Sequence, residues 1–185
     1  MFNELIIRIS RELKRNNLPY MIIGGQAVLL YGMPRMTKDI DISLGVSIDE
    51  LESVLKAVKD IDLDVIPEDF RAFAQKTFVL PTRDGSTAIR VDFIFSFTPY
   101  GRQAIERAKP IYFQDAPVMF ASVEDVIIHK VFAGRPRDLE DVHSIIVKNP
   151  DFDRDYTRKW LREFDRSTES GQFVGVFEDI LKAAG

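Results

Sequence analysis

Glycine and acidic residues between positions 20 and 44 have types and a spacing that suit phosphate and metal chemistry. Gly24 and Gly25 separate the short apolar run 20–23 from the run 26–31, which is predicted to be helical. Glycine lets the backbone come close to a ligand, and the first turn of a helix presents unpaired amides and a positive dipole end. Gly24, Gly25 and the next residue, Gln26, could therefore hold phosphate.

Three aspartates supply the second half of this chemistry. Asp39 and Asp41 point to one face of a predicted strand at 39–44, because side chains alternate along a strand. Asp92 is the one carboxylate in the apolar run 91–95 of a later predicted strand. Converging carboxylates repel one another by about 1 kcal/mol per pair at ~4 Å in water, and a dication removes that repulsion. Because oxygen ligands suit Mg²⁺ or Mn²⁺, we expect Asp39, Asp41 and Asp92 to hold such an ion together with a nucleoside triphosphate.

The glycine pair and the aspartate pair each also have a purely structural interpretation. An Asp-x-Asp pair at the end of a strand can face solvent or cap a turn, and a Gly-Gly pair can be a simple turn. The order of the elements favours the functional interpretation. The glycines directly precede a predicted helix, and the aspartates follow on the next predicted strand.

The elements that must position these residues alternate between strands and helices up to about residue 120. Apolar residues at helical spacing predict a helix at 2–15, and a capping box at 47–50 predicts a helix that runs to about residue 59. Residues 67–76 are ambiguous and permit a short helix. The other predicted strands are 20–23, 63–66, 77–81, 88–95, 111–113 and 118–120, and the other predicted helices are 26–31 and 101–108.

From Ser122 onward the chain is predicted to be entirely helical, with helices at about 123–133, 137–148, 154–166 and 173–183. We therefore predict an α+β (α/β-like) fold, in which residues 1–120 form a mixed β-sheet flanked by helices. Residues 121–185 form a helical C-terminal region. No Pro-, Gly- or Ser-rich linker separates the two parts, so we expect the helical region to pack on the core.

Composition limits the possible chemistry. The 185 residues have a net charge of −4, which gives no overall basic field for nucleic acid. The chain has no Cys and only two His, which excludes disulfides, thiolate metal sites and cysteine nucleophiles and disfavours a histidine-rich zinc site. No apolar run reaches membrane length and no signal-peptide pattern is present, so we expect a cytoplasmic protein without a membrane partner.

Gly24-Gly25, Asp39-Ile40-Asp41 and Asp92 resemble, in this order, the signature of the DNA polymerase β-like nucleotidyltransferase superfamily. The run from Gly24 to Ile42 is similar to small bacterial members of the toxin–antitoxin and abortive-infection type. One departure is that the superfamily often has Ser after the first glycine, where this chain has Gly25.

This resemblance implies a magnesium- and nucleotide-binding enzyme that uses an NTP such as ATP. It would move a nucleoside monophosphate to a hydroxyl of RNA, such as tRNA, or of a partner protein. A toxin–antitoxin setting with a cognate toxin or antitoxin partner is implied as well. Two alternatives stay open: a small-molecule, antibiotic-type nucleotidyltransferase, and a non-catalytic nucleotide-binding module of the same fold.

A second charged cluster follows in the predicted helical region. Lys130 lies on the apolar stripe of its helix, and Asp138 borders the core-facing stripe of the next one, with Asp141 three residues further on. Lys130 followed by Arg137-Asp138-Leu139-Glu140-Asp141 resembles the small nucleotidyltransferases. That resemblance implies a catalytic Lys130 that reaches the triphosphate, with substrate-binding roles for Arg137, Asp138 and Asp141.

The alternative for these four residues is a structural ion-pair network that joins two helices. Thr37 and Lys38 immediately precede the Asp39–Asp41 pair. We expect these two residues to border the nucleotide site.

Overall fold

The computed structural model describes residues 2–169 and 171–185. Contacts divide the chain into two compact units. The first consists of the residues up to Gln26 together with Thr37–Ala121, and the second consists of Ala27–Met36 and Ser122–Gly185. The predicted division of the chain near residue 120, with the helical part packed on the core, stays a prediction.

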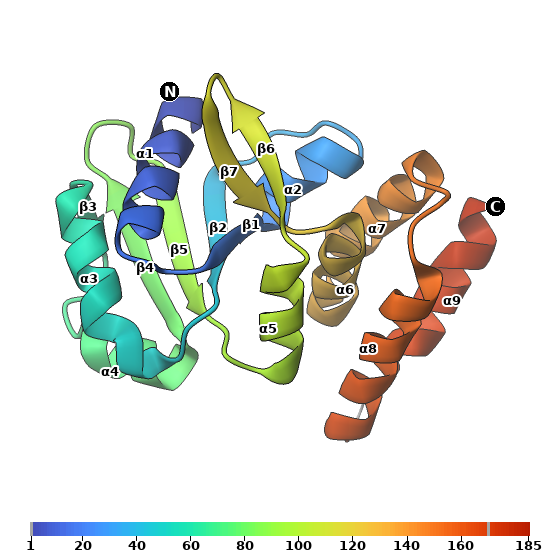
Figure 1. The fold of residues 1–185 in the computed structure, drawn as a ribbon. Coiled ribbons are helices and arrows are strands. Elements are labelled where there is room, and N and C mark those ends of the chain that lie inside the picture. Colours follow the sequence, from blue (N-terminus) through green and yellow to red (C-terminus); the bar gives the residue numbers. More distant parts are fainter. Residues whose placement is uncertain (1, 170) are drawn as a thin grey trace. The chain divides into compact units, whose positions relative to one another are not determined.

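The first unit is built on a mixed seven-stranded sheet with the strand order β3-β4-β5-β2-β1-β7-β6 (Figure 1). β2 runs parallel to β5 and β1 runs parallel to β7, whereas the other neighbouring strands are antiparallel. The strands are β1 (Tyr20–Ile23), β2 (Asp39–Leu44), β3 (Leu63–Val65), β4 (Val79–Asp84), β5 (Arg90–Phe95), β6 (Lys109–Phe113) and β7 (Ala116–Phe120).

Helices flank this sheet, as the sequence predicts. α1 packs against β7 and α3, while α3 and α4 pack against the strands β3 and β4. The helices of this unit are α1 (Phe2–Arg15), the 3₁₀ turn η1 (Ile48–Glu50), α3 (Leu51–Asp60), α4 (Phe70–Thr77) and α5 (Pro99–Glu106). α2 (Gly24–Tyr31) begins in the first unit and ends in the second.

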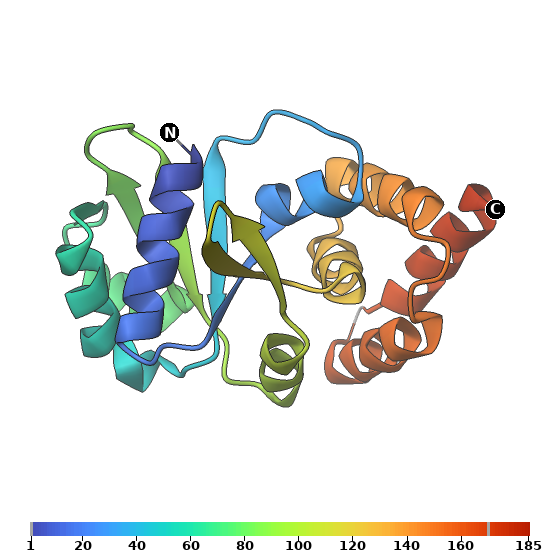
Figure 2. The same cartoon turned by 45° about the horizontal axis from the view of Figure 1, so that its top comes forward.

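The second unit consists mainly of α6 (Val123–Ala133), α7 (Pro136–Lys148), α8 (Arg154–Ser167) and α9 (Phe173–Ala184). α6 contacts α7 and α8, and α9 contacts α7 and α8 (Figure 2). Phe177 on α9 is fully buried, and its ring meets the ring of Phe152 edge to face at 6.1 Å between centroids. The helical C-terminal region is therefore confirmed.

None of the helices in the described part of the chain has the length and the apolar character needed to cross a bilayer.

Several predicted boundaries were wrong, each for a local reason. The helix predicted at 26–31 begins at Gly24, so the two glycines form its first turn instead of a separate turn. The strand predicted at 77–81 begins at Val79 and continues to Asp84. The residues before this strand belong to helix α4. The Asp69 side chain caps the start of α4, and Phe78 ends the helix in a left-handed conformation with φ 57°.

The two faces of the central strands differ as the alternation predicts. Ile40 and Ile42 on β2, and Val91 and Phe93 on β5, are fully buried on the apolar face. The alternate positions form the other face, where carboxylates stay partly exposed. Burial of the apolar face fixes the strand register, since a slip by one residue would bring these carboxylates into the core.

Candidate active site

The register of β2 and β5 brings two of the three predicted aspartates side by side. Asp41 pairs directly with Asp92, and Asp39 pairs with Arg90. Neighbouring strands lie about 4.8 Å apart, and paired residues point to the same face. The side chains of Asp39, Asp41 and Asp92 therefore share one face at the same end of the two strands.

Gly24 lies directly against Asp41. Ile23, the last residue of β1, pairs with Asp41, and the chain then turns into α2 at Gly24 with φ +63°. A Cβ atom built on Gly24 would lie 1.9 Å from Oδ2 of Asp41. Glycine is required here for both reasons, because L side chains disfavour this φ and no Cβ fits beside the carboxylate. Gly25 and Gln26 follow in the first turn of α2.

Arg90 is a further member of this cluster, which the sequence motif does not single out. Its Nε donates to both carboxylate oxygens of Asp92, at 2.8 and 3.1 Å. The hydrogen bond to Asp92 raises the pKa of Arg90, and the charges of Asp92, Asp39 and Asp41 raise it further. Strand alternation could have placed Arg90 on the face of Asp92, but its pairing with Asp39 depends on the register between β2 and β5.

The residues of this cluster fit a divalent cation by their chemistry. Carboxylate oxygens are the ligands that Mg²⁺ and Mn²⁺ prefer, and a guanidinium cation already lies beside Asp92. Within the described residues, no three His, Cys, Asp or Glu side chains are gathered closely enough to hold a metal. Asp92 is turned to Arg90, and Asp41 lies against Gly24.

Thr37 and Lys38 lie just before β2 in the same unit. The Thr37 hydroxyl donates to the backbone carbonyl of Asp39 at 3.3 Å, and Lys38 is exposed. Thr37 thus shapes the backbone at the start of β2. Lys38 leaves its ammonium group accessible to an anion.

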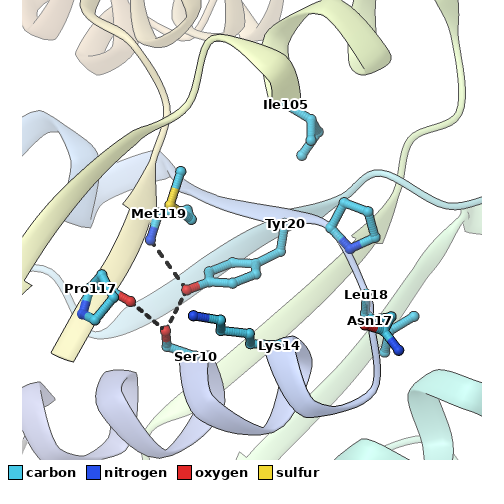
Figure 3. A pocket seen from close by; sticks show the side chains of 9 residues that line it. Ser10, Lys14, Asn17, Leu18, Tyr20, Ile105, Pro117 and Met119 are labelled. Atoms are coloured by element: carbon cyan, nitrogen blue, oxygen red, sulfur yellow. Dashed lines mark hydrogen bonds between the residues drawn. The ribbon is translucent and has the colours of Figure 1, made fainter.

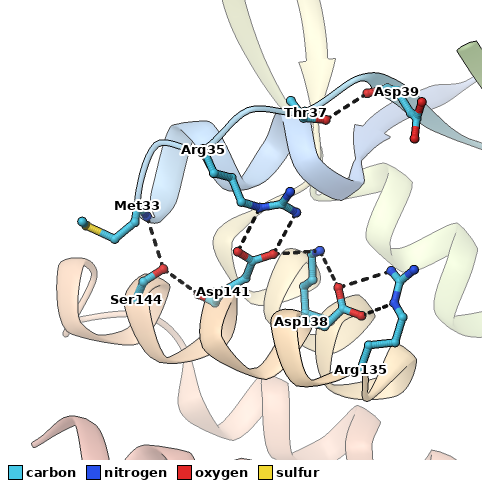
Figure 4. Close-up of polar contacts among 9 residues, drawn as sticks. Met33, Arg35, Thr37, Asp39, Arg135, Asp138, Asp141 and Ser144 are labelled. Carbon is cyan, nitrogen blue, oxygen red and sulfur yellow. Dashed lines mark hydrogen bonds and ion pairs between the residues drawn. The ribbon is translucent and has the colours of Figure 1, made fainter.

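The second predicted cluster lies in the second unit and includes Asp138 and Asp141 on α7 (Figure 4). Lys130 is only 7% exposed at its side chain, and its Nζ lies 2.7 Å from Asp138 Oδ1 and 3.0 Å from Asp141 Oδ2. Arg135 adds a contact of 2.5 Å to the other oxygen of Asp138. Burial raises the pKa of Asp138, but hydrogen bonds from Arg135 and Lys130 outweigh it and lower that pKa overall.

Asp141 is held by an arginine that precedes β2 in the chain. Arg35 donates from Nε and from a terminal nitrogen to the two oxygens of Asp141, at 3.1 and 3.0 Å (Figure 4). Arg137, which lies one helical turn before Asp141 in the sequence, is exposed. Lys130, Asp138 and Asp141 are thus brought together in an ion-pair network whose other members are Arg35 and Arg135.

A pocket of about 440 Å³ lies elsewhere in the first unit, around Tyr20 at the start of β1 (Figure 3). Its polar groups bond to one another: Tyr20 donates to Ser10 at 2.6 Å, and Ser10 donates to the carbonyl of Pro117 at 3.0 Å. Tyr20 pairs with Leu44 at the far end of β2 from Asp41. This pocket is therefore distinct from the carboxylate cluster.

Comparisons with known proteins agree on the fold. The solution structure of the antibiotic-resistance factor ANT(2'')-Ia matches with a TM-score of 0.58 and 19% identity, over 89% of this chain and 91% of that chain. An antigenic nucleotidyltransferase-like protein from Paracoccidioides brasiliensis matches with a TM-score of 0.58 and 16% identity, over 98% of this chain and 92% of that chain.

The lincomycin-bound lincosamide antibiotic adenylyltransferase LnuA matches with a TM-score of 0.52 and 15% identity, over 77% of this chain and 94% of that chain. At these identities the likeness shows a nucleotidyltransferase-like fold and no more. A search of curated proteins gave no match.

A family model decides the relationship at the level of sequence. The model described as "Nucleotidyl transferase AbiEii toxin, Type IV TA system" matches residues 8–181, which is nearly the whole chain. The match includes the Gly24–Asp41 unit, Asp92 and the Lys130 network. The chain therefore belongs to the AbiEii family of nucleotidyltransferase toxins of type IV toxin–antitoxin systems.

Proposed function

We propose that this protein transfers a nucleoside monophosphate from an NTP to a hydroxyl of RNA or of a partner protein, with Mg²⁺ or Mn²⁺ as cofactor. One observation supports this most strongly: Asp41 and Asp92 are paired in register, with Asp39 on the same face and Gly24 against Asp41. In the reaction the acceptor oxygen forms a bond to the α-phosphorus. The bond between the α-phosphorus and the oxygen that bridges it to the β-phosphorus breaks, and pyrophosphate leaves.

Each residue of the carboxylate cluster has a separate role in this proposal. Asp39, Asp41 and Asp92 would hold the metal, which when bound neutralises phosphate charge and lowers the pKa of the attacking hydroxyl. Asp92 would also accept the proton of that hydroxyl. Because no side chain covers its backbone, the Gly24-Gly25 turn would bring amides close to the phosphates.

The substrate-binding roles of the remaining residues are proposals that rest on position and charge. Gln26, in the first turn of α2, and Thr37 and Lys38, before β2, adjoin the cluster in the chain. Lys130 would offset negative charge on the leaving pyrophosphate. The network contacts of Lys130 support the structural alternative more directly, with Asp138, Asp141 and Arg137 in supporting positions.

A labelling assay tests the proposal. The protein is incubated with each labelled NTP and Mg²⁺ or Mn²⁺, together with total tRNA and a protein extract, and products are separated on gels. We expect a labelled RNA or protein, with loss of at least about 100-fold in rate for Asp41→Asn and for Asp92→Asn. Asp64→Asn is the matched control, because Asp64 is an exposed carboxylate on strand β3 of the same sheet.

The assay also separates the other acceptor classes. Solved structures with this fold contain adenylyl-2''-tobramycin and lincomycin. Transfer to added tobramycin or lincomycin, without transfer to RNA or protein, would replace the proposal with a small-molecule activity. NTP binding without any transfer would indicate a non-catalytic nucleotide-binding module. A toxin role further predicts that a neighbouring gene encodes an antitoxin, and that its co-expression relieves growth arrest.

A further inference from the structure

The carboxylate cluster belongs to an ordered row of charges across four strands. Asp39 on β2 pairs with Arg90 on β5, Arg90 pairs with Arg83 on β4, and Arg83 pairs with Asp64 on β3. Paired residues in a sheet point to the same face, with Cβ atoms about 5 Å apart. Arg90 is thus flanked by Asp39 on one side and by Arg83 on the other.

Arg90 interacts most strongly with the aspartate two positions further along its own strand. Its Nε lies 2.8 Å from Asp92 Oδ1, and the side chains of Arg90 and Asp92 are 49% and 17% exposed. The charges of Asp39 and Asp41 act on the same guanidinium. Arg90 therefore contacts Asp92 directly and lies beside Asp39 in the sheet.

A metal ion and Arg90 would compete for the same charge. The Asp92 oxygens that bond to Nε are the ones a metal needs, and a dication beside a guanidinium would be repelled by it. Arg90 is half exposed, so its side chain can move away without unpacking the core. Once displaced, the guanidinium needs another anion, and phosphate is an anion that arginine binds in a two-pronged geometry.

We propose that Arg90 is the counter-ion of the carboxylate cluster, and that it makes the cluster bind a metal–nucleotide complex in preference to the bare ion. The metal would replace Arg90 at Asp92, and the nucleotide phosphates would take up the released guanidinium. Arg90 is then a positioning residue that determines which form of the metal is accepted. This inference rests on the proposed function, since it requires the cluster to bind metal.

Binding of Mn²⁺ tests the inference without an activity assay. Free Mn²⁺ is counted by electron paramagnetic resonance in titrations of the whole protein, first with Mn²⁺ alone and then with Mn²⁺ and a non-hydrolysable NTP analogue. For Arg90→Gln we expect about fivefold tighter binding of bare Mn²⁺, since an exposed ion pair is worth up to about that factor. Binding of the analogue with Mn²⁺ should become weaker by a similar factor.

Two further variants separate this role from a general effect of charge or folding. Arg83→Gln removes the same charge from the neighbouring strand but leaves the Arg90–Asp92 hydrogen bonds in place, so both affinities should change less than about twofold. Arg90→Lys keeps the charge but not the two-pronged geometry, so it should restore the weak binding of bare Mn²⁺ and only part of the affinity for the analogue with Mn²⁺. Thermal unfolding of each variant confirms that it is folded.

The outcomes distinguish the inference from the function on which it rests. Opposite shifts of the two affinities in Arg90→Gln support the inference. If the wild type binds Mn²⁺ and Arg90→Gln binds it no more tightly, or if both affinities shift in the same direction, the inference is overturned while the metal-dependent function stands. If neither protein binds Mn²⁺ with or without the analogue, the inference and the proposed function fail together.

Discussion

At the scale of single residues, position 24 is where the fold most specifically requires a glycine. Its φ of +63° and the 1.9 Å distance that would separate an added Cβ from Asp41 are separate obstacles to any side chain. Gly134, at the end of α6, has nearly the same φ of +64°, but a Cβ there would lie 3.6 Å from the nearest atom, a carbonyl oxygen. A substitution at either glycine therefore strains the backbone, but only a substitution at Gly24 also causes a steric conflict.

We predict that Gly134→Ala lowers the free energy of unfolding by about 1 kcal/mol, and that Gly24→Ala lowers it by about 2–3 kcal/mol and displaces Asp41. Urea unfolding measures both changes. Nucleotide transfer by Gly24→Ala should fall well below that of Gly134→Ala. Equal losses of stability and activity in the two variants would contradict the close contact of Gly24 with Asp41.

His129 on α6 gives the fold a dependence on pH. Burial lowers its pKa from an ordinary 6.5 to about 4, and the charge of Lys130 contributes. Between these values the unfolded chain binds a proton that the folded chain does not, so stability falls as the pH drops from 6.5 toward 4. The linked loss at about pH 4 is at most about 3 kcal/mol.

His129→Gln should therefore flatten the stability profile between pH 6.5 and about pH 4, as measured by urea unfolding at several pH values. His143→Gln is the matched control, because His143 is the only other histidine and is exposed. A profile of His129→Gln that is as steep as that of His143→Gln would show that His129 is not the group responsible.

At the scale of secondary-structure elements, the link between α6 and α7 combines a sharp turn with a buried ion network. Gly134 ends α6 in a left-handed conformation, and Pro136 begins α7, so that Asp138 and Asp141 face Lys130. Breaking a buried pair typically costs about 3–5 kcal/mol, because an uncompensated charge stays behind. Arg35 and Arg135 still neutralise the two aspartates if Lys130 is lost.

We predict that Lys130→Met lowers the free energy of unfolding by about 2 kcal/mol, below the usual range because of these two arginines. Arg135→Gln, whose side chain is 75% exposed, should cost less than about 1 kcal/mol. If Lys130→Met is fully stable but loses nucleotide transfer, Lys130 acts on the substrate and the structural alternative for it is wrong. A loss of stability that accounts for the lost activity would support that alternative.

Elements with strong end signals can be predicted from the sequence to within a residue. The sequence predicts helix α6 at 123–133, because Ser122 caps its start and Gly134 its end. The start of β4 carries no such signal, since it depends on where α4 ends, and Phe78 ends that helix in a conformation that is rare for phenylalanine.

The same distinction applies to the candidate site. Alternation along each strand indicates that Asp39 and Asp41 share a face and that Asp92 faces away from the core. The pairing of Asp41 with Asp92 and of Asp39 with Arg90 depends on a register between strands about fifty residues apart, which no local pattern specifies. No local pattern specifies the contact between Arg35 and Asp141 either, because the two residues lie far apart in the sequence.

At the scale of the whole molecule, the family model identifies a nucleotidyltransferase toxin, and the fold is that of nucleotidyltransferases. The acceptor has to be identified by experiment. The central claim is that Asp39, Asp41 and Asp92 together bind the metal of a metal–nucleotide complex. The most direct measurement is anomalous X-ray diffraction at the manganese edge from crystals grown with Mn²⁺ and a non-hydrolysable NTP analogue. We predict an anomalous peak for a manganese ion that lies within coordination distance of carboxylate oxygens of these three residues and of the phosphates. A manganese peak at other residues, or a bound analogue without a manganese peak at this cluster, would contradict the claim.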